Sequence, residues 1–529
     1  MIVYRAWVAR LYWNTPGKRM SDKKSGLASY ENVDSDYLEK RSLKKSAGWV
    51  LLWALGVGAV ISGDYFGWNF GLEAGGFWGL AIATLVMAVM YVCMVFSIAE
   101  LSAALPHAGG FYSFVRNAFG PTGGFICGLT DAIEYVITPA VIVVGIGGYM
   151  NDLVGGLTGE EFSGYDPLWW VLAYLCFVTI NIRGVELTLK VGLVITLAAL
   201  AVLIVFYVSA VVSGSFDPEL LFNIPAEEGQ DPRWLPKGWS GVFLALPFAI
   251  WFYLAIEQLP LAAEETHDVV RDMPKALILG IITLLVLSVF TLVLNTGIGG
   301  GALAIQKSDA PLGEGFKAIF GSGGMTLFLT LIALTGLIAS FHTIIYAYGR
   351  VLFALSRAGY FPRWISRTSG QKTPHRALIL GAVIGLACAL VLHFLGKKES
   401  ESGEVVNTAV GGALLNMAVF GAVISYALVM FSYIKLRITR PDLERPYRSP
   451  LGIPGAALGA LLSIAALGAT IYREDFRPGI YGVGAFLVLG MVYYLLYSRH
   501  KLVAQAPEEE VALLAKHLGE LDGKMESNE

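Results

Sequence analysis

The sequence predicts an all-α polytopic membrane protein with twelve transmembrane helices. Hydrophobic residues make up 55% of its 529 residues and charged residues only 15%, whereas a soluble protein has about 25% charged residues. Runs of about 20 apolar residues, the length that crosses a bilayer, recur along the whole chain. No soluble domain interrupts them, so we expect a single membrane unit with two polar tails.

The expected spans form a ten-helix core at 47–437 and two appended helices at 438–499, flanked by tails at 1–46 and 500–529. The twelve spans are 48–71, 77–104, 123–150, 167–183, 188–213, 240–263, 275–299, 324–350, 377–396, 405–434, 452–472 and 479–498.

Positive charge predicts the orientation. Most of the 38 lysines and arginines fall in the tails and the even-numbered connections, which the positive-inside rule places in the cytoplasm. We therefore expect a protein of the cytoplasmic membrane with both termini inside the cell. The outer loops are richer in acid, as at Glu160-Glu161.

The two tails differ in character. Residues 1–19 are basic and aromatic, with too short an apolar run for a signal peptide. They are either an upstream extension from a misassigned start or an interfacial amphipathic segment. The C-terminal tail begins a short amphipathic helix at Glu508; we expect a solvated end, with an interaction segment as the alternative.

The first span has an unusual centre, Gly58–Gly67, which is rich in glycine and contains Asp64. Glycine is a weak helix former, and an ionised carboxylate inside a membrane costs at least about 2.5–3.5 kcal/mol. A helix broken at mid-depth accounts for both features, and such breaks form the binding sites of many secondary transporters. The alternative is a flexible continuous helix with Asp64 near the outer surface.

The sixth span is irregular as well. It carries Pro247, then the aromatic trio Trp251–Tyr253 and the acid Glu257. Irregular spans at positions 1 and 6 predict two five-helix halves, the second repeating the first in inverted orientation, with the last two spans appended.

Enzyme and metal chemistry have little support in the sequence. The four cysteines, Cys93, Cys127, Cys176 and Cys388, lie in apolar spans without metal-ligand spacing. There is no histidine cluster, nucleophile elbow or phosphate loop, and no basic block typical of nucleic-acid binding. We therefore predict a non-enzyme with no cofactor, metal or nucleic-acid partner.

Four segments together resemble the amino acid–polyamine–organocation transporters in order and spacing, and they cover most of the chain. They are Ser62-Gly63, Glu100–Tyr112 with Ala118–Pro121, Glu257 with Ala263–Glu265 and Arg271–Pro274, and Arg350–Pro362.

Within that superfamily, Ser62–Asn69, Pro247–Glu257 and Ala339–His342 are most similar to the ethanolamine permease branch. The resemblance implies the inverted five-plus-five fold and alternating access. It also implies that the substrate lies between spans 1, 3, 6 and 8.

In this family the break in span 1 offers backbone amides to a substrate carboxylate, and Ile61, Ser62 and Gly63 match that position. Asp64 departs from the usual apolar residue. A fixed negative charge there would favour an ammonium-bearing substrate without a carboxylate, such as ethanolamine. Alternatively, Asp64 caps the second half-helix and contacts no substrate.

Trp251, Phe252 and Tyr253, with Ala255, match the family's break in span 6, whose aromatic side chains line and gate the site. An ammonium over an aromatic face gains roughly 0.5–2 kcal/mol. Without the resemblance, three consecutive aromatic residues are more typical of a lipid-facing surface.

The resemblance assigns gating and proton linkage to Glu257. Glu134 in span 3 is expected to face the cavity, where it pairs with the amine or shares a proton with Glu257; alternatively it satisfies a buried tyrosine or arginine. Asp131 is a weaker candidate. His342 stands where relatives carry a small polar residue, and it either lines the site or packs as a hydrogen-bonded core residue.

Some relatives couple transport through a lysine in span 5, but the matching position here is Ala199. Proton coupling would therefore run through carboxylates, and facilitated exchange is the alternative.

The leading hypothesis is a permease in the lipid bilayer that imports ethanolamine or a similar small amine, with protons as a candidate second partner. A permease for neutral or cationic amino acids, acting as a proton symporter or an exchanger, is the nearest alternative. A nutrient sensor that does not transport is a more distant one. The sequence predicts no oligomeric state.

Overall fold

The computed structural model describes residues 28–158, 165–308, 310–321, 324–399, 407–472, 477–510 and 512–513. The alternatives for residues 1–19, the acidic loop at 160–161 and the end of the C-terminal tail from residue 514 lie outside the described residues.

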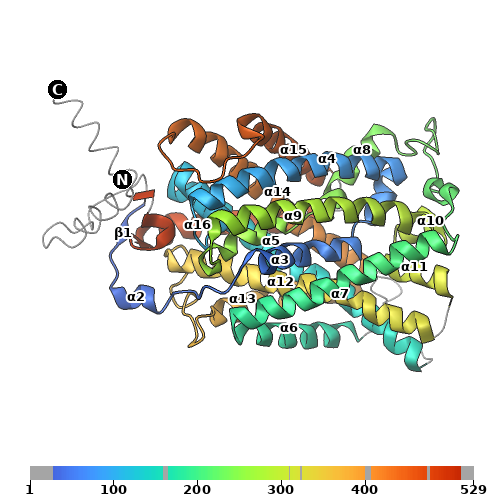
Figure 1. Ribbon diagram of the computed structural model, residues 1–529, viewed down its shortest axis with the longest axis horizontal. Helices are drawn as coiled ribbons and strands as arrows, with labels where there is room; N and C mark the ends of the chain where they lie inside the picture. The colour runs from blue at the N-terminus through green and yellow to red at the C-terminus, as the bar shows by residue number, and fades with distance from the viewer. Residues whose placement is uncertain are drawn as a thin grey trace, which may run out of the picture.

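Most of the described chain is helical, and the long helices lie roughly along one common axis (Figure 1). The helices are α2 (Ser35–Glu39), α3 (Trp49–Val60), α4 (Phe70–Ala104), α5 (Gly110–Thr158), α6 (Asp166–Ile182), α7 (Val185–Val212), α8 (Gly238–Ile250), α9 (Val269–Phe290), α10 (Gly301–Ile305), α11 (Pro311–Phe320), α12 (Gly324–Arg357), α13 (His375–Glu399), α14 (Asn407–Thr439), α15 (Gly452–Tyr472) and α16 (Arg477–Leu496). Short 3-10 and π segments are η2 (Ile61–Asp64), η3 (Pro218–Phe222), η4 (Ile256–Glu265), η5 (Thr291–Asn295) and η7 (Ser498–His500), and the two strands are β1 (Tyr30–Glu31) and β2 (Leu502–Val503).

Helix length and composition agree with a multi-pass membrane protein. Within the described ranges, nine helices are long and apolar enough to cross a membrane. Three shorter apolar helices, Trp49–Asp64, Asp166–Ile182 and Gly238–Ile250, stand where the sequence predicts spans 1, 4 and 6. The two spans predicted to be broken are thus both among the short helices.

The bundle has a buried centre and an apolar outer surface. The most apolar part of α5 is completely buried and that of α12 almost completely, whereas α16 exposes most of its apolar stretch. Side chains such as Val488 and Leu489 on α16 are 64% and 69% exposed. Helices that present apolar side chains outward are suited to lipid, because their backbone polar groups are satisfied within the helix.

The first break lies where the glycine-rich segment predicts it. Helix α3 ends at Val60, the chain continues as the 3-10 segment η2, and an irregular turn leads to α4 at Phe70. Helix α4 then changes direction at Gly76, whose positive φ of 67° interrupts the helix between the first and second predicted spans.

The second break follows α8, which ends at Ile250. The chain makes a turn over Trp251–Ala255 before η4 begins. Ala255 has a left-handed backbone with φ of 86°, which costs a residue with a Cβ atom roughly 1–2 kcal/mol. Its N–H donates to Glu257 Oε1 at 2.8 Å, so the side chain of Glu257 stabilises the conformation that ends the helix.

The two breaks pack directly against each other through glycine. A Cβ atom added to Gly63 would lie 2.3 Å from the carbonyl oxygen of Trp251. At Gly67, whose φ is 98°, it would lie 2.7 Å from Trp251 Nε1. Glycine is required at these positions because the backbones and the indole approach too closely for any side chain.

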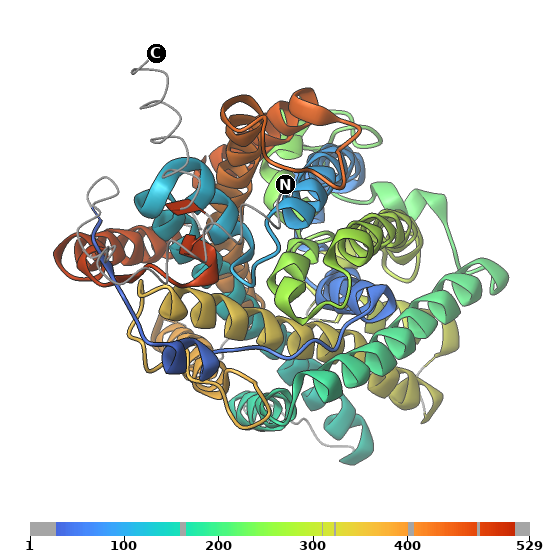
Figure 2. The ribbon, with the colours of Figure 1, turned by 60° about the vertical axis from the view of Figure 1, so that its left-hand side comes forward.

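Both ends of the described chain meet at one end of the bundle, which we call the terminal face. Strand β1 pairs in parallel with β2, with Tyr30 opposite Leu502 and Glu31 opposite Val503. Figure 2 shows the blue N-terminal segment between α2 and α3 crossing this face.

The C-terminal segment is not a solvated end in this structure. The side chains of Glu508 and Glu509 are both fully buried, because Arg357 and Arg116 form ion pairs with them. Acidic residues are almost never fully buried unless they are paired. The expectation of a solvated end was therefore wrong for these two residues, which pack against arginines of the same chain; the alternative of an interaction segment stays a prediction.

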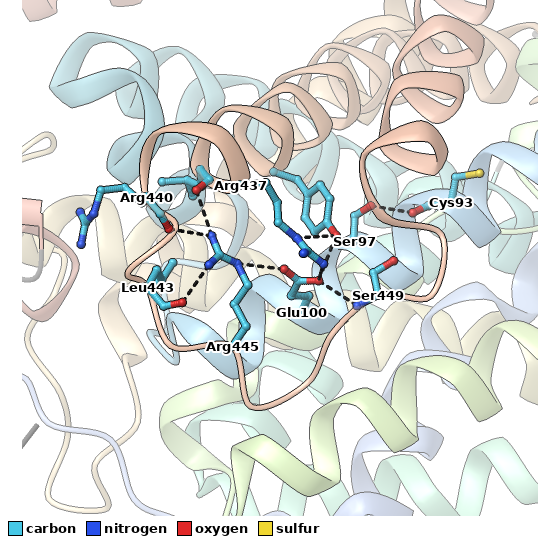
Figure 3. Close-up of polar contacts among 10 residues, drawn as sticks. Cys93, Ser97, Glu100, Arg437, Arg440, Leu443, Arg445 and Ser449 are labelled. Carbon is cyan, nitrogen blue, oxygen red and sulfur yellow. Dashed lines mark hydrogen bonds and ion pairs between the residues drawn. The ribbon is translucent and has the colours of Figure 1, made fainter. Parts of the chain in front are cut away.

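A third buried acid attaches α4 to the connection between α14 and α15. Glu100 Oε2 accepts hydrogen bonds from Arg437 Nη2 at 2.6 Å and from the backbone N–H of Ser449 at 2.8 Å. Arg445 Nε lies 3.1 Å from Glu100 Oε1. Figure 3 shows the carboxylate between the two arginines. This cluster holds the connection that leads into the penultimate long helix, α15.

The contact between the breaks yields a stability prediction. We expect Gly63→Ala to destabilise the protein by about 1–3 kcal/mol, the usual cost of overpacking, because the added methyl group meets a backbone carbonyl that cannot rotate away. Gly482→Ala in α16 is the matched control, since its Cβ atom would meet nothing within 4 Å. Thermal unfolding in detergent measures both variants. An equal melting temperature for the two would contradict the packing.

Candidate functional site

The residues singled out from the sequence all lie in the interior, around the two breaks. They are Ile61–Asp64 in η2, Trp251–Tyr253 and Ala255 in the turn after α8, Glu257 in η4, Glu134 in α5 and His342 in α12, and all are buried.

Asp64 lies at the end of η2 with no exposed surface. Its Oδ1 accepts a hydrogen bond from Thr291 Oγ1 at 2.8 Å, and Thr291 Oγ1 lies 2.6 Å from the hydroxyl of Tyr207. Among the described residues, Asp64 Oδ2 has no hydrogen-bond partner. The bond to Thr291 joins the first break to η5, and Asp64 does not cap α4.

A pair of carboxyl groups lies between α5, η4 and α14. The hydroxyl of Tyr426 lies 2.6 Å from Glu257 Oε1 and 3.1 Å from Glu134 Oε1. Tyr91 extends the network, with its hydroxyl 3.1 Å from that of Tyr426. Within the described part of the chain, Oε2 of each glutamate is buried without a donor from another residue, and the two carboxyl groups interact with each other. Glu134 therefore contacts a buried tyrosine and shares it with Glu257.

The aromatic trio does not face lipid. Trp251, Phe252 and Tyr253 are 3%, 0% and 1% exposed, and Phe252 stacks on Trp68 from the first break with ring centroids 5.5 Å apart. The hydroxyl of Tyr253 lies 2.9 Å from Ser288 Oγ on α9. These residues form an internal wall that links the two breaks.

The backbone amide of Ser62 is already occupied. It donates to Ser340 Oγ on α12 at 2.9 Å, and Ser340 in turn donates to the carbonyl of Gly58 at 2.8 Å. Ser340 thus replaces the helical hydrogen bond that is lost at the break and holds the first break against α12. In this conformation the amide is not available to a ligand.

His342 engages other helices. Its Nε2 lies 2.9 Å from the carbonyl oxygen of Thr188, and its Nδ1 lies 3.2 Å from Asn181 Nδ2. Both ring nitrogens are therefore used in packing against α6 and α7, as the core-histidine alternative describes. At the position of the relatives' coupling lysine, the carbonyl of Ala199 accepts a hydrogen bond from Tyr65 at 2.8 Å.

Four residues of this polar interior were not singled out from the sequence: Thr291, Tyr426, Tyr207 and Ser340. Ser340 stands inside the segment Ala339–His342, where a small polar residue close to the break was a usable signal. The other three are single hydroxyl residues in apolar helices, and nothing in the local sequence distinguishes them.

The site combines buried acids with aromatic and hydroxyl groups. Asp64, Glu134 and Glu257 each have a buried carboxyl oxygen with no hydrogen-bond donor among the described residues. A charged group removed from water is costly unless a partner of opposite charge or a proton compensates it. The arrangement therefore suits a small cation, a proton or both.

A comparison with models of protein families identifies the family of this chain. The model of a family described as amino acid permease matches residues 48–495. The chain belongs to the amino acid permease family. The resemblance to the amino acid–polyamine–organocation transporters is thereby confirmed, and the chain is a multi-pass membrane transporter of the amino acid permease type.

Known relatives align with most of the length of this permease. It is 29% identical to an uncharacterized transporter of Rhizobium meliloti (strain 1021), over 84% of this chain and 89% of that protein. It is 26% identical to a branched-chain amino acid permease of Bacillus subtilis (strain 168), over 87% and 94% of the two chains. It is also 23% identical to a methylthioribose transporter of the same organism, over 88% and 96%.

The serine bridge yields a second stability prediction. We expect Ser340→Ala to destabilise the permease by about 1–3 kcal/mol, because the buried amide of Ser62 loses its partner. Ser463→Ala is the matched control, a buried serine on α15 whose hydroxyl contacts only the sulfur of Met90 among the described residues. Thermal unfolding of the two variants in the same detergent checks the difference. If both unfold at one temperature, the bridge contributes nothing to the break.

Proposed function

We propose that this permease imports ethanolamine or another small primary amine, and that Asp64 pairs with the ammonium group. The observation that carries the proposal is the carboxylate of Asp64, fully buried beside the contact of the two breaks, with one oxygen bonded to Thr291 and the other unpaired among the described residues. An ammonium group supplies both the charge and the donors that this oxygen lacks.

The surroundings of Asp64 are better suited to an amine than to an amino acid. A substrate carboxylate near the first break would lie beside the negative charge of Asp64, and the amide of Ser62 already donates to Ser340. The aromatic wall of Trp251–Tyr253 adds faces that attract a cation. An amine without a carboxylate avoids repulsion by Asp64, does not need the amide of Ser62, and can use the aromatic faces.

The second candidate is transport of an amino acid. The Ser62-Gly63 pair at the break supports it, since the family uses such small residues to bind a carboxylate, and so does the branched-chain amino acid permease among the relatives. The relatives differ in their printed substrates, methylthioribose included. Sequence similarity alone therefore does not choose the substrate.

We also propose the arrangement in the membrane: twelve crossings, an inverted five-plus-five core and two appended helices, with both termini in the cytoplasm. The breaks at the positions of predicted spans 1 and 6 and their direct contact support the repeat. The distribution of basic residues supports the orientation. Substrate would reach the breaks from either side in turn, by alternating access.

Glu134 and Glu257 are the proposed route for proton coupling. Their carboxyl groups share the hydroxyl of Tyr426, and two neighbouring acids without a cation readily share a proton. Facilitated exchange without protons is the alternative.

Asp64→Asn tests the amine site. We expect uptake of labelled ethanolamine by proteoliposomes to fall about 100-fold or more, because removing one partner of a buried charge pair costs about 3–5 kcal/mol. Asp166→Asn is the matched control, a buried aspartate at the start of α6 that binds Asn151. Its uptake should stay near the level of the unmodified protein.

Competition decides between the two substrate classes in the same assay. Excess unlabelled alanine, leucine or arginine should reduce ethanolamine uptake only weakly, because each carries a carboxylate. Strong competition by amino acids, or normal uptake by Asp64→Asn, would overturn the amine proposal.

Glu257→Gln tests proton coupling without disturbing the break. Glutamine keeps an oxygen that can accept the N–H of Ala255, but its amide does not gain or lose a proton in the pH range of the assay. We expect uptake driven by an imposed pH gradient to fall to the level without a gradient, while exchange of labelled for unlabelled substrate continues. Glu314→Gln, on the exposed face of α11, should leave the gradient dependence intact. An unchanged dependence in Glu257→Gln would contradict this role.

A further inference from the structure

The C-terminal segment Ala504–Glu510, which we call the clamp segment, is bound at the terminal face. Apolar packing does not explain this binding. Its apolar residues are small, and Ala504 and Ala506 are buried but contribute little apolar area. Its contact with the rest of the chain therefore depends on the fully buried Glu508 and Glu509.

Glu509 occupies a complete carboxylate site. Its Oε2 lies 2.6 Å from Arg116 Nε and accepts the hydroxyl of Tyr30 at 2.9 Å. Its Oε1 accepts the hydroxyls of Tyr360 at 2.9 Å and Tyr112 at 3.3 Å. Both oxygens thus have two donors, contributed by β1, α5 and the segment after α12. Charge-assisted hydrogen bonds of this kind are the strong ones.

Glu508 joins a second cluster. Its Oε1 lies 2.5 Å from Arg357 Nη2 at the end of α12, and the same guanidinium group binds Glu264 at 2.5 and 2.9 Å. Glu264 belongs to η4, the segment that follows the second break, and it also accepts the N–H of Ala108 at 3.1 Å. The clamp segment therefore contacts the arginine that holds η4 to α12.

The helix before the first break is attached to the same place. The backbone N–H groups of Ser46 and Ala47, just before α3, donate to the carbonyl of Glu265 at 2.7 and 2.9 Å. Glu265 is in turn paired with Arg350 of α12 at 2.8 Å. The halves of both broken helices that reach the terminal face are thus joined to each other and, through arginines, to α12.

This arrangement matters for transport because alternating access moves one group of helices against another. In the alternating access proposed above, opening the terminal face would separate η4 and α3 from α5 and α12. The clamp segment binds α12 through the pair of Glu508 with Arg357, and α5 through the pair of Glu509 with Arg116. Because Arg357 also pairs with Glu264 of η4, the segment acts on the η4–α12 junction through this arginine.

We propose that the terminal face carries a binding site for a two-glutamate peptide, formed by Arg116 and Arg357 with their neighbouring tyrosines. The chain's own clamp segment occupies it in cis. Bound, the segment holds this face of the permease closed; released, it allows the face to open. The proposal concerns access to the interior and is independent of which substrate is carried.

A native cysteine reports the state of this face. Cys127 lies on α5 between Arg116 and Glu134, is fully buried, and has its sulfur 3.8 Å from Asp131 Oδ2. It precedes Glu134 by seven residues, or about 10 Å along the helix. A polar maleimide can reach it only when the interior is open to water.

The test measures the rate at which the maleimide labels Cys127 in lipid nanodiscs, with Cys93, Cys176 and Cys388 replaced by alanine. We expect Glu508→Gln/Glu509→Gln to label at least about tenfold faster than the parent, because the local opening costs less free energy. Glu510→Gln, a neighbouring change that removes one negative charge where the double variant removes two, lies at a half-buried position and should label at the parent rate. Equal rates for the double variant and this control would overturn the proposal.

Rescue in trans separates a releasable clamp from a fixed structural element. A synthetic peptide of residues 502–513 should slow the labelling of the double variant, and the same peptide with glutamine at both positions should not. No slowing by the native peptide, or a double variant that aggregates and is not rescued by it, would show that the segment is a permanent part of the fold and would overturn the proposal.

Discussion

The structure depends on one close contact, the approach of Gly63 to the backbone of Trp251. This contact brings the interruptions of two distant helices together, so that side chains at both helix ends face a common interior. Any larger residue at position 63 would separate the breaks. A polar side chain stabilises each break: Ser340 accepts the amide of Ser62 in the first, and Glu257 accepts the amide of Ala255 in the second.

Buried charge is divided between two environments. In the interior, Asp64, Glu134 and Glu257 contact hydroxyl groups and the backbone, and each has a carboxyl oxygen without a donor among the described residues. At the terminal face, Glu265 and Glu509 are paired with arginines. An unpaired buried acid is a place for a mobile cation, whereas a paired one is a structural tie. The interior is therefore suited to binding, and the terminal face to controlling access.

The sequence predicted irregular spans 1 and 6, because glycine, proline and a carboxylate inside an apolar run conflict with a continuous helix, but it left open whether Asp64 is buried at the break or lies near the outer surface. It did not predict that Thr291 and Tyr426 would meet these acids, since a single hydroxyl in an apolar helix has no local signature. The role of Glu508 and Glu509 was equally hidden, because an acidic run near a chain end looks solvated until its arginine partners are known.

Composition and local pattern alone determined the membrane class, the family resemblance and the places where helices break. The membrane class and the helix breaks follow from the cost of polar groups and poor helix formers in lipid, whereas the family resemblance rests on the order and spacing of four short segments. Only the tertiary structure decided which acids are paired, which amide is occupied by Ser340 and where His342 packs. Those outcomes depend on contacts between residues 85 or more positions apart, and hydrogen bonds over such separations leave no periodic pattern in the sequence.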